Sequence, residues 1–385
     1  MRVLHVITAL GVGGAENMLL KLLQAPGLSP VRQQVIAMLP GGAMAGACRA
    51  TGAPVDEVNL LGGVPLVSGS LRLAQLARQA APDVVQGWMY HGNLGALLAR
   101  AVLPRRVPLV WGVRQSLASL DGENAWARVA IHANRLLSGR PDALVFNSST
   151  SIEQHRRFGF RNGQVHFLPN GFDGERFRPD AAQRARRRQA WGFDESHLVF
   201  GMLARLHPAK GQAHFLEAAA RLQASLPAAR FVIAGPDHAG QAAALQAQCR
   251  AAGLGHRVHI LVGHHAAHEL LPALDVFVSA STAIEAFSNA IGEALCCALP
   301  CIATDIGDSA WLVGDAGLVV EPAAPAALAA AMATLAELGA ERRAALGAQG
   351  RERVLRDFGI AAVAARFGEL WHGLAAQPPR AGGAR

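Results

Sequence analysis

Two glutamates, Glu285 and Glu293, stand at the ends of the nine-residue segment EAFSNAIGE, in a chain of which only 17% of the residues are charged. An apolar strand of sequence DVFVSA comes shortly before, and a helical period begins at Ser288 or Asn289. Ser288 therefore has the position of an N-cap, and such a helix start attracts phosphate through N–H groups that lack helical partners. A helical segment of this length covers about 12 Å, close to a joined sugar, diphosphate and ribose. One carboxylate would bind sugar hydroxyls and the other ribose hydroxyls; the alternative is an unrelated loop acid and helix acid.

A second set of candidates lies in the segment LARLHPAKGQ, where Arg205 ends an apolar strand and Lys210 follows five residues later. A diphosphate that leaves a sugar gains negative charge as the bond breaks. A guanidinium stays charged and binds two oxygens, and a lysine adds a mobile point charge. The alternative is a solvated basic loop, but parallel α/β sheets bind ligands at the carboxyl ends of their strands.

The glycines of ALGVGGAEN lie between the first strand and the first helix, where Gly11, Gly13 and Gly14 would let the backbone approach a phosphate or sugar closely. The segment does not fit a dinucleotide fingerprint. Glu16 stands in place of the third glycine, and the next strand ends in MLP without an acid for the ribose. We therefore expect no NAD site.

Further polar residues follow the apolar strands DVVQGW and VPLVWGV. His91 and Asn93 come after the first of these strands, at an expected cleft edge, and Arg114 comes after the second. A neutral imidazole can donate and accept hydrogen bonds near pH 7, which gives His91 a candidate role in the site.

A metal site is not expected in the segment GHHAAHE. Its residues His264, His265 and His268 have helical spacing, but beyond Glu269 no cysteine or acid joins them. The five cysteines are odd in number and form no CxxC pair, so we expect free thiols in a reducing cytoplasm.

These candidates depend on short apolar runs that alternate with stretches of helical period, a pattern typical of parallel sheets covered on both faces. Helices are predicted over 14–25, 93–103, 124–139 and 149–158 and then, after a boundary near residues 172–196, over 211–226 and 240–252. With 385 residues, the chain is long enough for two domains. We expect two doubly wound domains with a cleft between them.

Composition narrows the classes of partner. Hydrophobic residues make up 51% of the chain, but no run approaches the roughly 20 apolar residues that span a bilayer. The net charge is +8, and its densest basic run, Arg184 to Arg188, has no interleaved aromatic residues for stacking on bases. We interpret this run as a solvated helix face and expect no nucleic-acid partner, while weak contact with an anionic membrane stays open.

Together these residues resemble the retaining glycosyltransferases of family 4. The resemblance covers nearly the whole chain, through GGAE at 13–16, the segment around His91, NSSTSIEQH at 147–155, FLPNGFDGERFRP at 167–179, Arg205 with Lys210, VFVSAS at 276–281, and the two glutamates. It implies an α/β protein of GT-B fold, with two Rossmann-like doubly wound domains facing across a cleft. Residues 1–180 would form the acceptor-side domain and 195–358 the donor domain. Residues 359–376 would form a helix crossing back to the first domain, and 377–385 a frayed tail.

The resemblance also implies roles. Arg205 and Lys210 would bind the donor diphosphate, Glu285 would face the donor sugar, and Glu293 would hold the ribose. The implied catalytic set is Glu285, Arg205, Lys210 and His91, and the implied donor-binding set is Gly13, Gly14, Glu16, Arg205, Lys210, Glu285, Phe287, Ser288, Asn289 and Glu293. Many relatives have a histidine where Gln86 or Trp88 stands, so His91 would take that role and Trp88 would stack on a sugar ring.

The function that follows is a hexosyl- or other glycosyltransferase of class EC 2.4. It would move a sugar from a nucleotide-diphosphate sugar to a glycan or lipid-linked acceptor in surface polysaccharide biosynthesis, in the cytoplasm or at the inner face of the membrane. No metal or other cofactor is expected. The alternatives are a nucleotide-sugar epimerase or hydrolase of the same architecture and a non-catalytic basic protein that binds lipid or nucleic acid.

Overall fold

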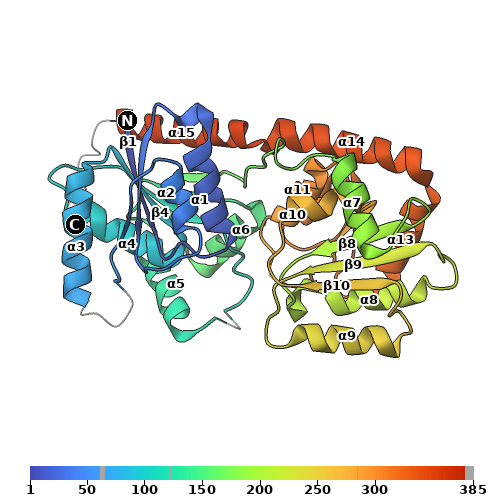
Figure 1. Cartoon of the computed structure of the whole chain (residues 1–385). Helices are drawn as coiled ribbons and strands as arrows, with labels where there is room; N and C mark the ends of the chain where they lie inside the picture. The colour runs from blue at the N-terminus through green and yellow to red at the C-terminus, as the bar shows by residue number, and fades with distance from the viewer. Residues whose placement is uncertain (61–65, 121–122, 284, 378–385) are drawn as a thin grey trace. The chain divides into compact units, whose positions relative to one another are not determined.

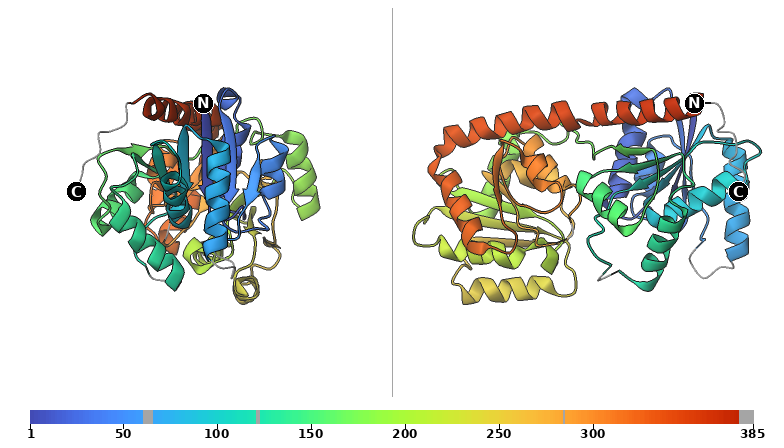
Figure 2. Two further views of the ribbon diagram at one scale, coloured as in Figure 1. Left: turned by 90° about the vertical axis from the view of Figure 1, so that its left-hand side faces the viewer. Right: turned by 180° about the vertical axis from the view of Figure 1, so that it is seen from behind.

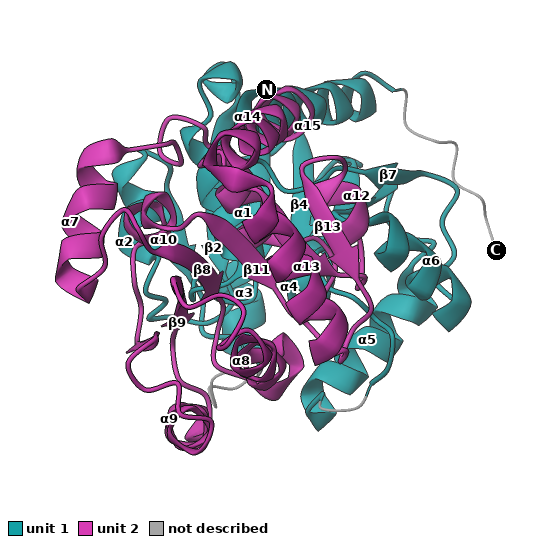
Figure 3. Cartoon of the chain, turned by 90° about the vertical axis from the view of Figure 1, so that its right-hand side faces the viewer, with its two compact units in different colours: residues 1–171, 360–385 teal, residues 172–359 magenta. Residues whose placement is uncertain are grey.

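The computed structural model describes residues 1–60, 66–120, 123–283 and 285–377. The chain divides into two compact units, coloured separately in Figure 3. The first consists of Met1–Gly171 with Ile360–Arg385, and the second of Phe172–Gly359. The chain therefore enters the second unit once and returns to the first at Ile360.

Within its described residues, the first unit holds a seven-stranded parallel sheet of order β3-β2-β1-β4-β5-β6-β7. The strands are β1 Arg2–Ile7, β2 Arg32–Ala37, β3 Val55–Glu57, β4 Val84–Trp88, β5 Leu109–Val113, β6 Ala143–Phe146 and β7 Val165–Phe167. The helices are α1 Gly14–Gln24, α2 Ala45–Ala50, α3 Leu66–Ala80, α4 Met89–Ala101, α5 Ala125–Leu137, α6 Ser149–Phe158 and α15 Ile360–Ala376, with a 3₁₀ turn, η1, at Pro26–Leu28.

The second unit has a parallel sheet of six strands in the described ranges, of order β10-β9-β8-β11-β12-β13. They are β8 Leu198–Leu203, β9 Ala229–Gly235, β10 Val258–Val262, β11 Val276–Ser279, β12 Cys301–Thr304 and β13 Gly317–Val320. The helices are α7 Ala181–Trp191, α8 Gln212–Arg221, α9 Gln241–Ala251, α10 Ala267–Leu270, α11 Asn289–Cys296, α12 Ser309–Val313, α13 Pro325–Glu337 and α14 Gly339–Phe358, with 3₁₀ turns η2 Pro208–Lys210 and η3 Leu271–Ala273.

Each sheet is buried on both faces, as its continuous apolar strands require. In the first unit one core packs under α1 and α15 and contains Trp88 and Trp371, and another contains Trp111 on the opposite face. The second unit also has two cores. Figures 1 and 2 show helices on both faces of each sheet. The prediction of two doubly wound α/β domains is confirmed.

The strand order reverses between β1 and β4 in the first sheet and between β8 and β11 in the second. In doubly wound sheets, ligands bind beyond the carboxyl ends of the strands at this switch point. The segments that follow these strands carry the predicted candidates: Gly13 after β1, His91 in the helix that begins directly after β4, Arg205 after β8 and Glu285 after β11. The strands β3 and β7 were not predicted, because each is only three residues long and is too short to show a hydrophobic period.

The last two helices of the described chain are α14, with 20 residues, and α15, with 17. Helix α15 packs in the first unit, where Phe367 stacks on Trp88 and the indole Nε1 of Trp371 donates to Gln86 Oε1 at 3.3 Å. No helix in the described ranges combines the length and apolar character needed to cross a membrane.

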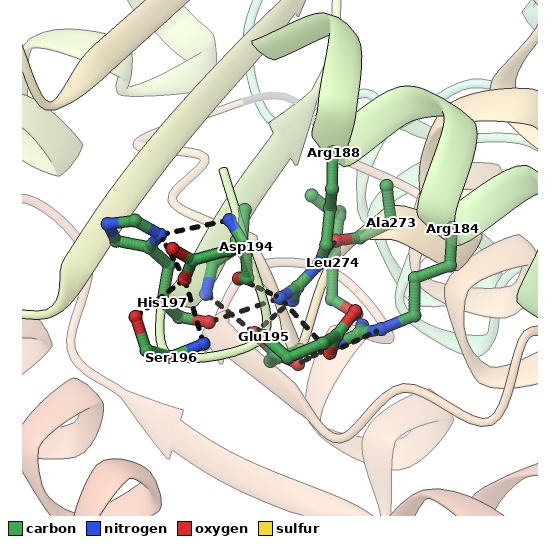
Figure 4. Close-up of polar contacts among 10 residues, drawn as sticks. Arg184, Arg188, Asp194, Glu195, Ser196, His197, Ala273 and Leu274 are labelled. Carbon is green, nitrogen blue, oxygen red and sulfur yellow. Dashed lines mark hydrogen bonds and ion pairs between the residues drawn. The ribbon is translucent and has the colours of Figure 1, made fainter. Parts of the chain in front are cut away.

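The interpretation of Arg184 to Arg188 as a solvated face is wrong for its inner residues (Figure 4). Arg188 on α7 is 1% exposed, and its Nη2 lies 2.6 Å from Oδ2 of Asp275. Its Nε donates to the carbonyl of Ala273 and its Nη1 to that of Asp194, while Arg184 binds the other oxygen of Asp275 at 2.9 Å. Asp275 comes directly before β11, so this ionic network braces the amino-terminal edge of the sheet, opposite the edge that carries the candidates.

Candidate functional site

Lys210 and Glu285 form an ion pair in the second unit, with Nζ 2.6 Å from Oε2. Ser281 Oγ donates to the same carboxylate oxygen at 3.3 Å. Both charged side chains are largely buried, at 21% and 14% exposure. Two residues that the sequence separates by 75 positions therefore meet at the carboxyl edge of the sheet.

The loop that carries Lys210 is held by backbone contacts between neighbouring strand ends. Gly211 has φ +75°, and a Cβ built there would lie 1.9 Å from the carbonyl oxygen of Ala280, so only glycine allows this approach. The amide of Thr282 donates to the carbonyl of Ala209 at 2.9 Å. The loops after β8 and β11 are thus fixed to each other, which positions Lys210 for its carboxylate partner.

Positive charge gathers around this pair. Arg205 is exposed, and its guanidinium makes no hydrogen bond or ion pair with the residues that the structure describes. The His207 and His238 rings lie 5.0 Å apart between centroids. Burial lowers the pKa of His207, and the charges of Arg205, His238 and Lys210 lower it further. These positive charges would attract a negatively charged ligand to this part of the second unit. Such a ligand would also favour the protonated form of His207.

His207 lies between the two basic candidates, Arg205 and Lys210, and was not predicted as a site residue. Its Nδ1 accepts from the amide of Ala209 at 3.1 Å and so caps the η2 turn. Its position in the loop after β8 could have indicated a role. The amino-acid sequence alone does not show that its side chain caps the η2 turn.

The start of α11 has the predicted geometry. Ser288 is its N-cap and Asn289 its first residue, and the Ser288 hydroxyl makes no capping hydrogen bond. The N–H groups of the first turn are therefore not satisfied by the N-cap side chain, the arrangement that suits an incoming phosphate. Glu293 lies about one turn further along the helix and is half-buried.

Phe287 anchors this helix start in the core. Its ring is 4% exposed and stacks on Phe172 at a centroid distance of 6.0 Å. On the adjoining loop, Gly307 has φ +61° and approaches so closely that a Cβ would lie 2.3 Å from the carbonyl oxygen of Glu285. Side-chain packing thus fixes the backbone between the two glutamates, and the ring itself is not available to a ligand.

In the first unit, Gly13 is the N-cap of α1 and Gly14 its first residue. Glu16 folds back over this turn: a Cβ on Gly13 would lie 2.4 Å from Oε2 of Glu16. Burial raises the pKa of the Glu16 carboxyl, although a hydrogen bond from its own backbone opposes the shift. Glycine at 13 therefore makes room for the carboxylate of Glu16 at the start of α1.

His91 lies in the first turn of α4 and is half-buried. Burial lowers its pKa, and a hydrogen bond with the backbone of Trp126 acts in the opposite direction. Its imidazole is therefore neutral near pH 7 and stays a candidate.

The expectation for Asn93 is wrong. This side chain is fully buried, donates to Asn134 Oδ1 at 3.1 Å and accepts from the amide of Gly112 at 3.2 Å. It ties α4 to α5 and β5, because a buried amide needs such partners, and it does not lie at a cleft edge.

Trp88 does not have the surface that stacking on a sugar would require. It is 1% exposed, and its Nε1 donates to Nδ1 of His5 at 3.1 Å. Since Phe367 covers its ring, the predicted stacking role is wrong. His5, whose Nε2 lies 3.0 Å from Gln33 Oε1, has a pKa lowered to about 4 by burial.

The histidines of GHHAAHE are not gathered around a point, and the described residues contain no group of three or more His, Cys, Asp or Glu side chains suited to a metal. His268 packs its ring edge-on against Phe177, and Glu269 pairs with Arg187. These side chains therefore have structural partners.

Two family models match the chain. One, described as a glycosyl transferase 4-like domain, matches residues 13–171, and the other, described as glycosyl transferases group 1, matches residues 183–353. Together they span most of both units.

Similar proteins agree with these matches. The GDP-mannose-dependent alpha-(1-6)-phosphatidylinositol monomannoside mannosyltransferase of Mycolicibacterium smegmatis is 29% identical over 306 residues, covering 76% of this chain and 77% of that protein. The putative glycosyltransferase EpsF of Bacillus subtilis is 28% identical over 336 residues, 82% of each chain. Among solved structures, HepE of Anabaena in complex with UDP has a TM-score of 0.85 at 22% identity, covering 97% of this chain and 100% of that one, a likeness of fold.

Proposed function

The chain belongs to the family 4 type of glycosyltransferases and has their GT-B fold, and from this premise we propose that it transfers a sugar with retention of anomeric configuration. The donor is a nucleotide-diphosphate sugar, and the acceptor is a glycan or a lipid-linked saccharide in surface polysaccharide or glycolipid assembly. The names of relatives are in keeping with this: one is a GDP-mannose-dependent enzyme of phosphatidylinositol mannosides, and HepE of Anabaena was crystallised with UDP.

The Lys210–Glu285 pair carries the proposal. In the free protein each charge has the other as its partner at 2.6 Å. A bound donor would divide them: its sugar hydroxyls donate to the Glu285 carboxylate, and its diphosphate takes Lys210 together with Arg205. These cations act where negative charge grows as the sugar leaves, so they stabilise the transition state more than the ground state.

The rest of the donor would follow α11. Its phosphate oxygens would accept from the backbone at Ser288 and Asn289, with the Phe287 backbone beside the sugar, and Glu293 would accept from the ribose hydroxyls. Two observations support this assignment: the Ser288 side chain makes no capping hydrogen bond, and Glu293 lies half-buried about one turn further along α11.

Retention is best accounted for by substitution on one face of the sugar. The bond from C1 to the diphosphate oxygen breaks, the acceptor oxygen bonds to C1 from the same side, and the acceptor proton passes to the departing phosphate. In this scheme the Glu285 carboxylate binds the sugar hydroxyls, and the Ser281 hydroxyl that donates to it helps to hold it in place. No enzyme nucleophile is required.

The first unit would contribute its own residues. Gly13 and Gly14 allow the backbone after β1 to approach a ligand closely, with the Glu16 carboxylate beside it. His91, neutral near pH 7, would offer a hydrogen bond to the transferred sugar. These roles follow from the strand-end positions at the β1/β4 switch point.

We propose that no metal ion or other cofactor takes part, because Arg205 and Lys210 supply the positive charge that a divalent cation would bring to a diphosphate. Activity should then persist in the presence of a chelator.

Contact with an anionic membrane is part of the proposal. Helix α5 exposes Trp126, Val129 and Leu136 by 78%, 61% and 75%. Their spacing places them on one side of the helix, and exposed Arg128 and Arg140 lie beside them in sequence. An apolar helix face flanked by cations suits the headgroup region of an anionic bilayer. The reaction would take place on the cytoplasmic side, where the five free cysteines stay reduced.

The deciding experiment screens the protein against UDP-, GDP- and ADP-sugars by thermal shift, because a ligand that binds only the native state raises the midpoint. The best donor is then incubated with and without saccharide acceptors, and the products are separated. Transfer to an acceptor supports the proposal. Epimerised donor in the absence of acceptor would assign the chain to the other reaction class, and lack of any nucleotide-sugar binding would exclude both.

A further inference from the structure

Arg114, directly after β5, has a guanidinium with an unused edge. Its Nη1 donates to Asn170 Oδ1, while Nε and Nη2 are buried and have no hydrogen-bond partner. The guanidinium carbon lies 5.2 Å from the centroid of the Trp88 ring and 5.6 Å from that of Phe367, so aromatic groups hold the flat ion in place. The Nε and Nη2 edge is the one that binds a carboxylate or phosphate through two parallel hydrogen bonds.

The charge of Arg114 is also uncompensated. Among the described residues no carboxylate acts on it: Nε and Nη2 have no partner, and no neighbouring charge contributes to its pKa. Burial alone lowers its pKa, to about 9. A buried donor without a partner costs free energy, and a buried charge without a counter-ion costs more, so such a group in a native protein calls for a ligand.

A second unpartnered group lies at the end of the neighbouring strand. Asn147 directly follows β6, is 2% exposed, and its Oδ1 has no hydrogen-bond partner. Val113 pairs in register with Phe146 as the last residues of β5 and β6, so Arg114 and Asn147 directly follow two paired strand ends. Gly112 and Val145, two residues earlier, form a pair of the same register, so both chains leave the sheet side by side.

The third strand end completes the cluster. Asn170 comes shortly after β7, is 3% exposed, and accepts from Arg114. The next residue is tied to α1, where Lys21 Nζ donates to the carbonyl of Gly171 at 2.8 Å. The ammonium group of Lys21 therefore contacts the residue that directly follows Asn170. Donors for an anion and an acceptor for a hydroxyl thus meet at the ends of β5, β6 and β7.

We propose that Arg114, Asn147 and Asn170 bind a saccharide ligand that carries an oxyanion next to a hydroxyl group. The oxyanion takes Nε and Nη2 of Arg114, and the hydroxyl donates to Oδ1 of Asn147. Both a uronic acid and a sugar phosphate have this chemistry. The assignment rests on the proposed function only in treating this ligand as the acceptor, so the acceptor is an acidic saccharide.

The test uses the full chain and isothermal titration with glucuronate, glucose 6-phosphate and glucose. The wild-type protein should bind at least one of the two acids more tightly than glucose. Arg114→Gln should weaken the acid by about tenfold or more, the usual cost of losing a charge-assisted pair, while glucose changes little. Asn147→Ala, which keeps the arginine, should weaken the acid severalfold. The matched control is Arg157→Gln, an exposed arginine on α6 whose partner is Glu153, which should leave both affinities unchanged.

UDP and GDP binding by the same variants separates this site from the donor site. The dissociation constants of UDP and GDP should stay within about twofold of the wild-type values in each variant, because no contact with the nucleotide is lost. Binding of only glucuronate or only glucose 6-phosphate identifies the anion and supports the inference. Equal binding of acids and glucose by wild type would overturn it, as would a parallel loss of nucleotide and acid in Arg114→Gln. If no nucleotide binds but the acid does, the proposed donor chemistry fails and this site stands.

Discussion

Lys210 Nζ lies 2.6 Å from Glu285 Oε2, so the loops after β8 and β11 already hold a cation and an anion together before a ligand binds. The pair is bound to a fixed frame, because Gly211 and Gly307 let neighbouring backbone approach it. In the proposed complex Lys210 binds the donor diphosphate and Glu285 binds the donor sugar. Replacing each residue separately therefore tests a different contact with the donor.

Lys210→Met and Glu285→Gln should each lower kcat/KM for sugar transfer by about a hundredfold or more, the loss typical of one electrostatic contact to a transition state. Initial-rate measurements with saturating acceptor would check this. Arg221→Met is the matched control, since Arg221 forms an exposed ion pair with Glu217 on α8 at 3.0 Å. Near wild-type rates in both site variants, with folding intact, would remove the pair from the mechanism.

Gly211→Ala should cost more than Gly240→Ala, although both residues have nearly the same φ, +75° and +77°, and both cap a helix. A Cβ at 211 meets the carbonyl of Ala280 at 1.9 Å, whereas nothing lies within 4 Å of one at 240. We expect about 1 kcal/mol for Gly240→Ala from the left-handed backbone alone, and a larger loss plus weaker donor binding for Gly211→Ala. Urea unfolding and donor titration provide the comparison; equal effects would mean that the close approach does not matter.

Arg188→Met should destabilise the second unit by roughly 1–3 kcal/mol, because Asp275 keeps only Arg184 of its two arginine partners and the carbonyls of Ala273 and Asp194 each lose a hydrogen bond. Arg186→Met, on the exposed side of the same helix, should change the free energy of unfolding by less than about 0.5 kcal/mol. Donor affinity of the folded Arg188 variant should stay unchanged, since the network lies at the other edge of the sheet. A selective loss of donor affinity without loss of stability would contradict this role.

Stability should fall in acid because of His5 and His155. Burial lowers the pKa of each from 6.5 to about 4 in the folded chain. The unfolded chain therefore binds more protons between these values, and stability is full above pH 6.5 and lost progressively as the pH falls toward 4. At pH 5 the loss is about 2 kcal/mol per histidine.

Urea midpoints at pH 7.5, 6 and 5 would measure this dependence. His5→Gln can still accept from Trp88 and donate to Gln33, so it should reduce the acid sensitivity without losing the fold. The exposed His264→Gln is the control and should retain it. A flat profile in the wild-type protein would show that neither histidine controls acid stability.

The sequence by itself determined the two α/β arrays and most strand-end candidates. Continuous apolar strands separated by helical periods specify a parallel sheet, and a strand followed by a polar loop identifies the edge where ligands bind. Local chemistry also placed the N-cap at Ser288, because a helix start depends on neighbouring residues. The strands β3 and β7 were not predicted, because a segment of three residues is too short to show a hydrophobic period.

Only the tertiary structure decided which side chains meet and which are covered. The sequence could not show that Lys210 pairs with Glu285, because their contact depends on β11 lying beside β8. It could not tell buried Arg188 from exposed Arg186, two positions apart on one helix. The sequence predicted that Trp88 stacks on a sugar, but Phe367 of α15, far along the chain, stacks on its ring. A residue's type states which bonds it can form, but burial and partners come from segments brought together by strand order.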